Sequence, residues 1–97
     1  MKIVIYSTPN CVNCTALKTT YKASNIPFEE KLIGTDVTIG QLEEKAGTPL
    51  KQAPVVFVND EFRGGIVQGM EIMKEYLEIQ KQQQEEEIAK LISGIQL

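Results

Sequence analysis

Two cysteines, Cys11 and Cys14, are the residues of this chain whose type and spacing point most directly to chemistry. Such a pair can cycle between dithiol and disulfide, bind a metal ion, or form a structural cross-link. A metal site ordinarily needs four ligands, whereas the chain has two cysteines and no histidine. A cross-link that closes so short a loop is a weak stabiliser. Redox exchange is therefore favoured, with a metal cluster shared between two copies of the chain as the alternative.

The expected positions of the two cysteines predict a different role for each. Cys11 follows a predicted strand and lies at the first turn of a predicted helix, beside unpaired N–H groups and the positive end of the helix dipole. This environment favours a thiolate, which is the nucleophilic form of cysteine. Cys14 lies about one turn further in, where it can resolve a mixed disulfide and release the product. Since the chain has no histidine, proton transfer is left to Cys14, water or a carboxylate.

Predicted strands and helices around the cysteines supply the elements that hold them in place. Cys14, Leu17 and Tyr21 fall on one face of a helix that is expected to end before Pro27. Thr38 is the expected N-cap of a second helix, in the capping-box pattern with the glutamine three residues later. The full pattern predicts strands over 2–7, 28–33, 55–58 and 61–63, and helices over 11–24, 38–46 and from near 69.

This order of elements, β-α-β-α-β-β-α, predicts an α/β fold. The expected arrangement is a four-stranded mixed sheet with helices on its faces, in which the first two strands are parallel and joined by a right-handed crossover. A chain of 97 residues suits one small domain around a single core. We expect that domain to span residues 1–79.

Residues 80–97 differ from the rest in composition. Residues 80–87 are all Gln, Lys or Glu, and apolar residues then return at helical spacing: Ile88, Leu91, Ile92 and Ile95. The pattern predicts an extra C-terminal amphipathic helix. Its apolar stripe is expected to fold back onto the domain, with dimerisation and partner docking as the alternatives.

Charge and hydropathy exclude several classes of function. The formal net charge of -3 and the pI of about 4.9 provide no basic surface for nucleic acid or for an anionic membrane. The apolar run over 3–6 is far too short for a signal peptide or a membrane span. We therefore expect a cytoplasmic protein, in which a structural disulfide is the less common use of a cysteine pair.

Three stretches together resemble the glutaredoxin family of the thioredoxin fold: IYSTPNCVNC at 5–14, QAPVVFVND at 52–60 and FRGG at 62–65. The resemblance covers roughly residues 1–79 and implies a three-layer fold with helices on both faces of the sheet. It also implies a thiol–disulfide oxidoreductase that reduces protein or glutathione mixed disulfides without a bound cofactor. Finally, it implies a cis Ala53–Pro54 peptide bond that faces the active-site disulfide, with the Ala53 backbone open to an extended substrate.

Further residues are candidate contacts for a substrate or for glutathione by the same resemblance: Thr8, Lys51, Gln52, Ala53, Pro54, Gly64 and Gly65. The glycine pair resembles the double glycine of the family, which permits a close backbone approach to the ligand. Thr8 stands where the family usually has a basic residue, and Lys51 is a cation near Pro54. Residues 66–68, Ile-Val-Gln, replace the usual small residue or cysteine followed by Asp.

The dipeptide between the cysteines, Val12-Asn13, differs from the Pro-Tyr typical of glutaredoxins. It is closer to the C-V-x-C of small glutaredoxin-like redoxins that feed ribonucleotide reductase and are recharged by thioredoxin reductase. The expected partners are thus a disulfide-bearing protein, with ribonucleotide reductase as one candidate, and either glutathione or thioredoxin reductase as electron source. A redox-regulated protein-binding module and a two-subunit iron–sulfur cluster carrier are the alternative functions.

Overall fold

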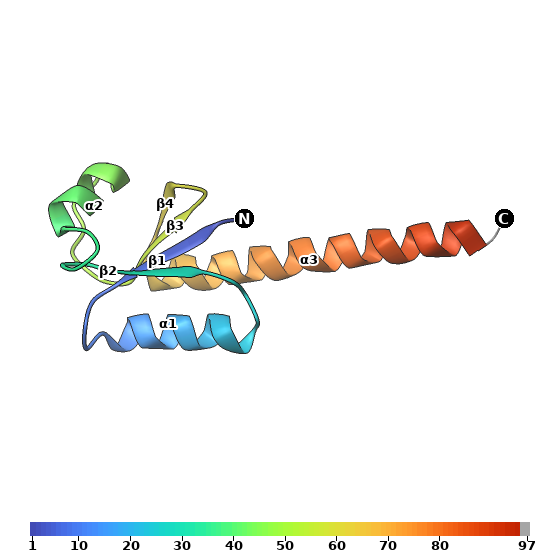
Figure 1. Cartoon of the computed structure of the whole chain (residues 1–97), viewed down its shortest axis with the longest axis horizontal. Coiled ribbons are helices and arrows are strands. Elements are labelled where there is room, and N and C mark those ends of the chain that lie inside the picture. The colour runs from blue at the N-terminus through green and yellow to red at the C-terminus, as the bar shows by residue number, and fades with distance from the viewer. Residues whose placement is uncertain (96–97) are drawn as a thin grey trace.

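The fold comes from a computed structural model that describes the backbone of residues 1–95 and the side chains of residues 1–81. Its elements follow the predicted order closely. They are β1 (Ile3–Ser7), α1 (Val12–Ala23), β2 (Glu29–Leu32), α2 (Ile39–Ala46), β3 (Val55–Val58), β4 (Glu61–Gly64) and α3 (Ile66–Ile95). Figure 1 shows α1 and α2 on opposite sides of the strands.

The four strands form one mixed sheet in the order β2-β1-β3-β4. β1 pairs in parallel with β2 and antiparallel with β3, and β3 pairs antiparallel with β4. All five residues of β1 are buried, as expected for a short apolar strand in the middle of a sheet with both faces covered. Because β1 is central, the turn that follows Ser7 leads straight from the core of the molecule to the cysteines.

Each face of the sheet has its own hydrophobic core, so the fold has the three predicted layers. One core packs α1 and α3 against alternate strand residues; its buried members are Ile3, Ile5, Leu17, Tyr21, Ile26, Val56, Val58 and Ile72. The other packs α2 against the opposite face; its buried members are Val4, Tyr6, Leu42, Val55 and Phe57. The alternation of β1 and β3 residues between these two cores follows from the two-residue period of a strand. The thioredoxin-like α/β fold is thereby confirmed.

Local signals account for the ends of two helices. Thr38 caps α2 in a complete capping box, in which its hydroxyl accepts from the Gln41 N–H while the Gln41 side chain accepts from the Thr38 N–H. α2 ends at Gly47, whose φ of 73° lies in the left-handed region that glycine adopts without strain. α1 ends at Ala23, four residues before Pro27.

The C-terminal part of the chain differs from the expected pattern in one respect. The helix expected from near Gly69 and the additional C-terminal helix are one continuous element, α3, which begins at Ile66 and runs for 30 residues. At 1.5 Å per residue it is about 45 Å long, and its second half extends beyond the sheet (Figure 1). The apolar stripe of Ile88, Leu91, Ile92 and Ile95 lies outside the residues whose side chains are described.

Candidate active site

Cys11 occupies the N-cap position of α1, one residue before the first helical residue. Its backbone is extended, with φ of -100° and ψ of 109°, and its carbonyl accepts the first intrahelical bond from the Thr15 N–H at 3.1 Å. Cys14 is the third residue of the helix and is 1% exposed, whereas Cys11 is half-buried. The two cysteines form a disulfide, with their Cα atoms 5.2 Å apart. This is the oxidised state of a pair in which Cys11 is the sulfur that a substrate can reach.

Two backbone groups contact the Cys11 sulfur and act on it in opposite directions. The Cys14 N–H donates to Cys11 Sγ at 3.1 Å, which favours a thiolate in the reduced protein. The Ala53 carbonyl oxygen lies 3.6 Å from the same sulfur, where it favours a thiol that donates to it. The N–H contact is the shorter one, and the positive end of α1 acts in the same direction. We therefore expect the thiolate to be favoured once the disulfide is reduced.

The Ala53–Pro54 peptide bond is cis, as the resemblance implied. Pro54 is buried immediately before β3, and the preceding residue brings its carbonyl to Cys11 from 42 positions away in the sequence. The folded chain thus places the loop before β3 directly beside the Cys11 sulfur. No signal within the cysteine motif itself encodes this contact.

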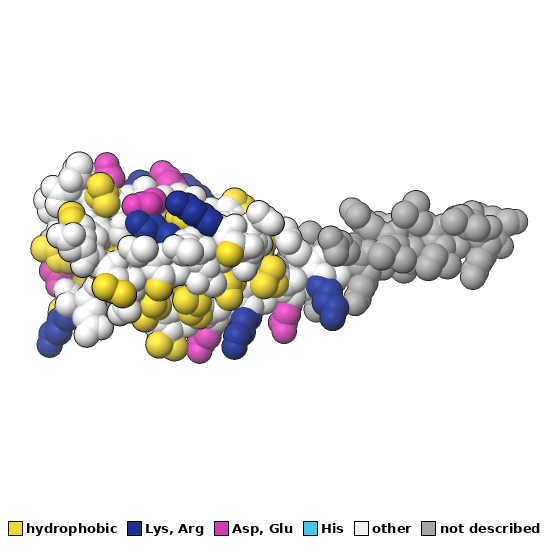
Figure 2. Space-filling view, turned by 90° about the horizontal axis from the view of Figure 1, so that it is seen from below, with side chains coloured by type: hydrophobic (Ala, Val, Ile, Leu, Met, Phe, Trp, Pro, Cys, Tyr) yellow, Lys and Arg dark blue, Asp and Glu magenta, His cyan; other side chains and the backbone are white. Residues whose placement is uncertain are grey.

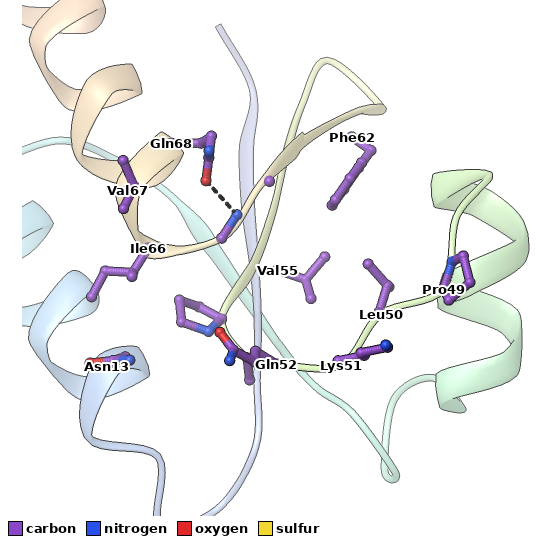
Figure 3. A pocket seen from close by; sticks show the side chains of 14 residues that line it. Asn13, Pro49, Leu50, Lys51, Gln52, Val55, Phe62, Ile66, Val67 and Gln68 are labelled. Atoms are coloured by element: carbon purple, nitrogen blue, oxygen red, sulfur yellow. Dashed lines mark hydrogen bonds between the residues drawn. The ribbon is translucent and has the colours of Figure 1, made fainter.

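A pocket of about 480 Å³ lies next to this loop. It contains six of the predicted contact residues, Lys51, Gln52, Ala53, Pro54, Gly64 and Gly65, together with Asn13 from the first turn of α1. Figure 3 places Asn13 and Ile66 at one side of the pocket and Leu50, Val55 and Phe62 at the other. Among the residues that line it, all of which belong to the described part of the chain, Lys51 carries the only charge. The pocket therefore suits a ligand with an extended backbone and an anionic group.

Gly64 and Gly65, at the end of β4, differ in how strongly the structure requires a glycine. Gly64 has a φ of 129°, and a Cβ there would lie 2.6 Å from Cγ of Gln68. The backbone conformation therefore disfavours any other residue at position 64, and an added Cβ would also displace the exposed Gln68 side chain. A Cβ at Gly65 would lie 3.5 Å from the Pro54 carbonyl oxygen, an ordinary contact. Gly64 is the position at which the pair requires glycine.

Gln68 lines the pocket and bonds to the backbone of Gly65, a role that sequence reasoning did not identify. Its Oε1 accepts from the Gly65 N–H at 3.0 Å, shown as the dashed line in Figure 3. Gly65 in turn accepts the first bond of α3 from the Gly69 N–H, so Gln68 makes one half of a capping box. The glutamine three residues after Gly65 is the sequence signal that could have indicated this contact. Gln68 is neutral, so it adds no negative charge to the pocket.

Thr8 is the one predicted contact residue that does not line this pocket. It lines a neighbouring hollow with Ile33 and Ile39, and this hollow shares Lys51, Gln52 and Ala53 with the first pocket. The structure thus brings Lys51 to both sites, while Thr8 contributes a hydroxyl to the second. Lys51 is thus the cation that lines the hollow beside Thr8.

Lys18 lies one helical turn beyond Cys14, but its charge is directed to another group. Its ammonium donates to Glu30 Oε1 at 2.9 Å, and the Ser7 hydroxyl donates to the same oxygen at 3.3 Å. The hydrogen bond from Lys18 holds the pKa of the Glu30 carboxyl below its usual value. Since Glu30 offsets its charge, Lys18 is not needed to account for a Cys11 thiolate.

Within residues 1–81, no three His, Cys, Asp or Glu side chains gather in a way that could hold a metal ion. None of the described helices has the length and apolar character that crossing a bilayer requires.

Comparison with known proteins places this geometry in context. A sequence model described as glutaredoxin matches residues 3–63, which is more than half of the chain. The oxidised glutaredoxin of Escherichia coli is 25% identical, with a TM-score of 0.64 over 80% of this chain and 99% of that one. Its reduced form is 26% identical over the same shares, with a TM-score of 0.61. Glutaredoxin 1 from Francisella tularensis, solved with cacodylate, is 24% identical over 79% of this chain and 96% of its own; its TM-score of 0.61 supports the fold. No curated protein matches the chain significantly in sequence.

Proposed function

The chain belongs to the glutaredoxin family and is a thiol–disulfide oxidoreductase of that type, and on this premise we propose that it reduces protein disulfides and glutathione mixed disulfides. Cys11 is the proposed nucleophile and Cys14 the resolving thiol. The assignment rests on the position of Cys11 and on the groups around its sulfur. Cys11 caps α1, accepts the Cys14 N–H at 3.1 Å and lies beside the loop at Pro54.

The proposed reaction consists of two exchanges that balance in atoms and electrons. The Cys11 thiolate attacks one sulfur of the substrate disulfide, forms a mixed disulfide with it and releases the other sulfur as a thiolate, which takes up a proton. The Cys14 thiolate then attacks Cys11 Sγ, and the second substrate thiolate leaves. The substrate gains two electrons, and the protein is left with the Cys11–Cys14 disulfide that the structure contains. A thiol reductant returns the two electrons.

The pocket beside Pro54 supports glutathione mixed disulfides as one substrate class. Its volume of about 480 Å³ lies within the usual range of small-molecule sites. Glutathione is a short peptide with anionic ends, and Lys51 offers a cation to one of them. The backbone before Pro54 and the glycines at the end of β4 flank the pocket. A protein that must return repeatedly to its dithiol form also needs reducing surroundings, which supports a cytoplasmic location.

The test compares two electron sources on one substrate. The protein is supplied with a glutathionylated peptide and NADPH, together with either glutathione and glutathione reductase or thioredoxin reductase. Turnover with the glutathione system is expected. Turnover with thioredoxin reductase alone would keep the oxidoreductase but overturn glutathione as its reductant.

A pair of lysine variants tests the pocket. Lys51→Met is expected to raise KM for the glutathionylated peptide about two- to fivefold, the worth of one exposed charge pair. Lys74→Met removes the same charge from an exposed position on α3 and serves as the matched control. Equal KM values for the two variants would show that Lys51 does not contribute to substrate binding.

A further inference from the structure

A second hollow, of about 570 Å³, adjoins Cys11 on the surface of α1. Cys11 itself lines it, with Asn10, Val12, Thr15 and Ala16. It shares no lining residue with the pocket beside Pro54, which Cys11 does not line. The reactive sulfur therefore adjoins a surface that the proposed glutathione site does not use.

The chemical character of this hollow is apolar. Val12 is 82% exposed, and Ala16 is exposed on the next turn of the helix. The Thr15 hydroxyl donates to the Cys11 carbonyl at 3.1 Å, so it is already engaged and its methyl group remains available. None of the five lining residues is charged, whereas Lys51 lines the other pocket. Figure 2 views the molecule from the side of α1, where hydrophobic side chains gather along the lower half of the described part and a group of charged ones lies above them.

We propose that this hollow receives an apolar side chain of a polypeptide substrate, adjacent to the cysteine whose sulfur Cys11 attacks. The inference rests on the proposed function and adds to it a substrate preference. The attacked substrate sulfur bonds to Cys11 Sγ in the first exchange and leaves it in the second, so the residues next to that sulfur must pass over the surface around Cys11. The charged ends of glutathione find no partner in the hollow, while an apolar side chain replaces water against Val12 and Ala16. The protein half of a mixed disulfide is therefore the occupant.

The expected preference follows from the apolar area that can be covered. A leucine side chain that is partly buried in an open hollow gains only a fraction of its full transfer free energy. This corresponds to a preference in kcat/KM of about three- to tenfold over a serine at the same place. The preference comes from the side chain next to the substrate cysteine and not from the disulfide itself. A small disulfide without such a side chain should therefore not show it.

The experiment measures single-turnover reduction, so that it does not depend on the electron source. The reduced protein is mixed with either of two glutathionylated peptides that differ only in the residue after cysteine, leucine or serine. Hydroxyethyl disulfide is run as the small substrate. Ala16→Asn makes the hollow polar without adding charge near Cys11, and Thr19→Asn makes the same side chain one turn further along the exposed face of α1.

The wild-type protein and Thr19→Asn are expected to prefer the leucine peptide by the same factor, and Ala16→Asn to bring the ratio close to one. Because each ratio is internal to one variant, a general loss of stability or activity does not imitate the result. Equal rates with the two peptides in the wild type, or an unchanged ratio in Ala16→Asn, would overturn the inference. Failure to reduce even hydroxyethyl disulfide would instead count against the proposed function.

Discussion

Cys11 and Cys14 share one reaction but occupy very different surroundings. Cys11 is half-buried at the N-cap of α1, while Cys14 is 1% exposed within the helix. A bulky substrate can therefore bond to Cys11 but not to Cys14. The Cys14 N–H already contacts Cys11 Sγ, so the backbone of the proposed resolving residue also favours a thiolate on the proposed nucleophile.

This difference predicts opposite outcomes for the two serine variants. Cys14→Ser keeps the backbone N–H and the nucleophile, so it is expected to accumulate a mixed disulfide with a glutathionylated peptide. Cys11→Ser is expected to form no adduct and to reduce no disulfide. Mass spectrometry of the intact protein after mixing distinguishes the two. An adduct on Cys11→Ser would reverse the assigned roles.

Tyr21 is a second residue whose surroundings determine its behaviour. Its hydroxyl is buried and donates to the Gly69 carbonyl at 2.6 Å, which ties α1 to α3. Burial, with a smaller contribution from the Glu75 charge, raises the pKa of Tyr21 to about 12 from its usual value of 10.0. The neutral phenol is thus favoured in the folded state.

The raised pKa predicts a loss of stability in alkali. Because the folded pKa exceeds the unfolded one, this contribution is complete below about pH 10 and is lost as the pH rises through about 12. Tyr21→Phe is expected to cost about 0.5–1.5 kcal/mol at neutral pH, the net worth of one hydrogen bond. Its difference from the wild type should shrink between these two pH values, as followed by urea unfolding. A difference that stays constant across this range would contradict the assignment.

At the level of elements, the approach of α1 to α3 depends on a glycine in the first turn of α3. A Cβ at Gly69 would lie 2.8 Å from Cδ2 and 2.9 Å from Cδ1 of Leu17, which is fully buried. Leu17 is on the same helix as the cysteines, three residues after Cys14. A displacement of α3 here therefore reaches the helix that carries the active site.

Gly69→Ala is expected to destabilise the protein by about 1–3 kcal/mol, because the added methyl group overpacks a full core. Gly40→Ala, in α2, is the matched control. Its Cβ would approach nothing closer than Thr38 Oγ1 at 4.0 Å, so the higher helix propensity of alanine should stabilise by about 0.5–1 kcal/mol. Urea unfolding measures the change in the free energy of unfolding for both variants. A change of the same sign in both would refute the packing argument.

At the level of the whole molecule, α3 serves the domain with its first half. On the face of the sheet that α1 and α3 cover, four residues of α3 belong to the hydrophobic core: Met70, Ile72, Met73 and Tyr76. The helix then continues to Ile95. The molecule measures 59 Å along its longest axis and 25 and 20 Å across. We propose, as the sequence predicted, that residues 1–79 form the redox domain and that the remainder is an additional element.

A protein that ends at Ile79 is therefore expected to fold and to reduce disulfides at the rate of the full chain. Circular dichroism and single-turnover reduction measure the two properties, and sedimentation compares the oligomeric state with that of the full chain. A control at full length replaces Ile88, Leu91, Ile92 and Ile95 with glutamine. Unfolding of both variants would mean that the apolar stripe belongs to the core and that the domain boundary at residue 79 is wrong.

Short-range sequence patterns were sufficient to predict the fold class, the capping box of α2 and the start of the helix beside Cys11. Each of these follows from elements whose signals lie within a few positions of one another. The resemblance to a family was sufficient for the cis bond at Pro54. Other features required the folded chain: the Ala53 carbonyl beside Cys11, the separation of Thr8 from the pocket at Pro54, and the hollow on α1. These depend on how β1 and β3 pair and on how the helices cover them, so their distances are set by contacts between residues far apart in the sequence.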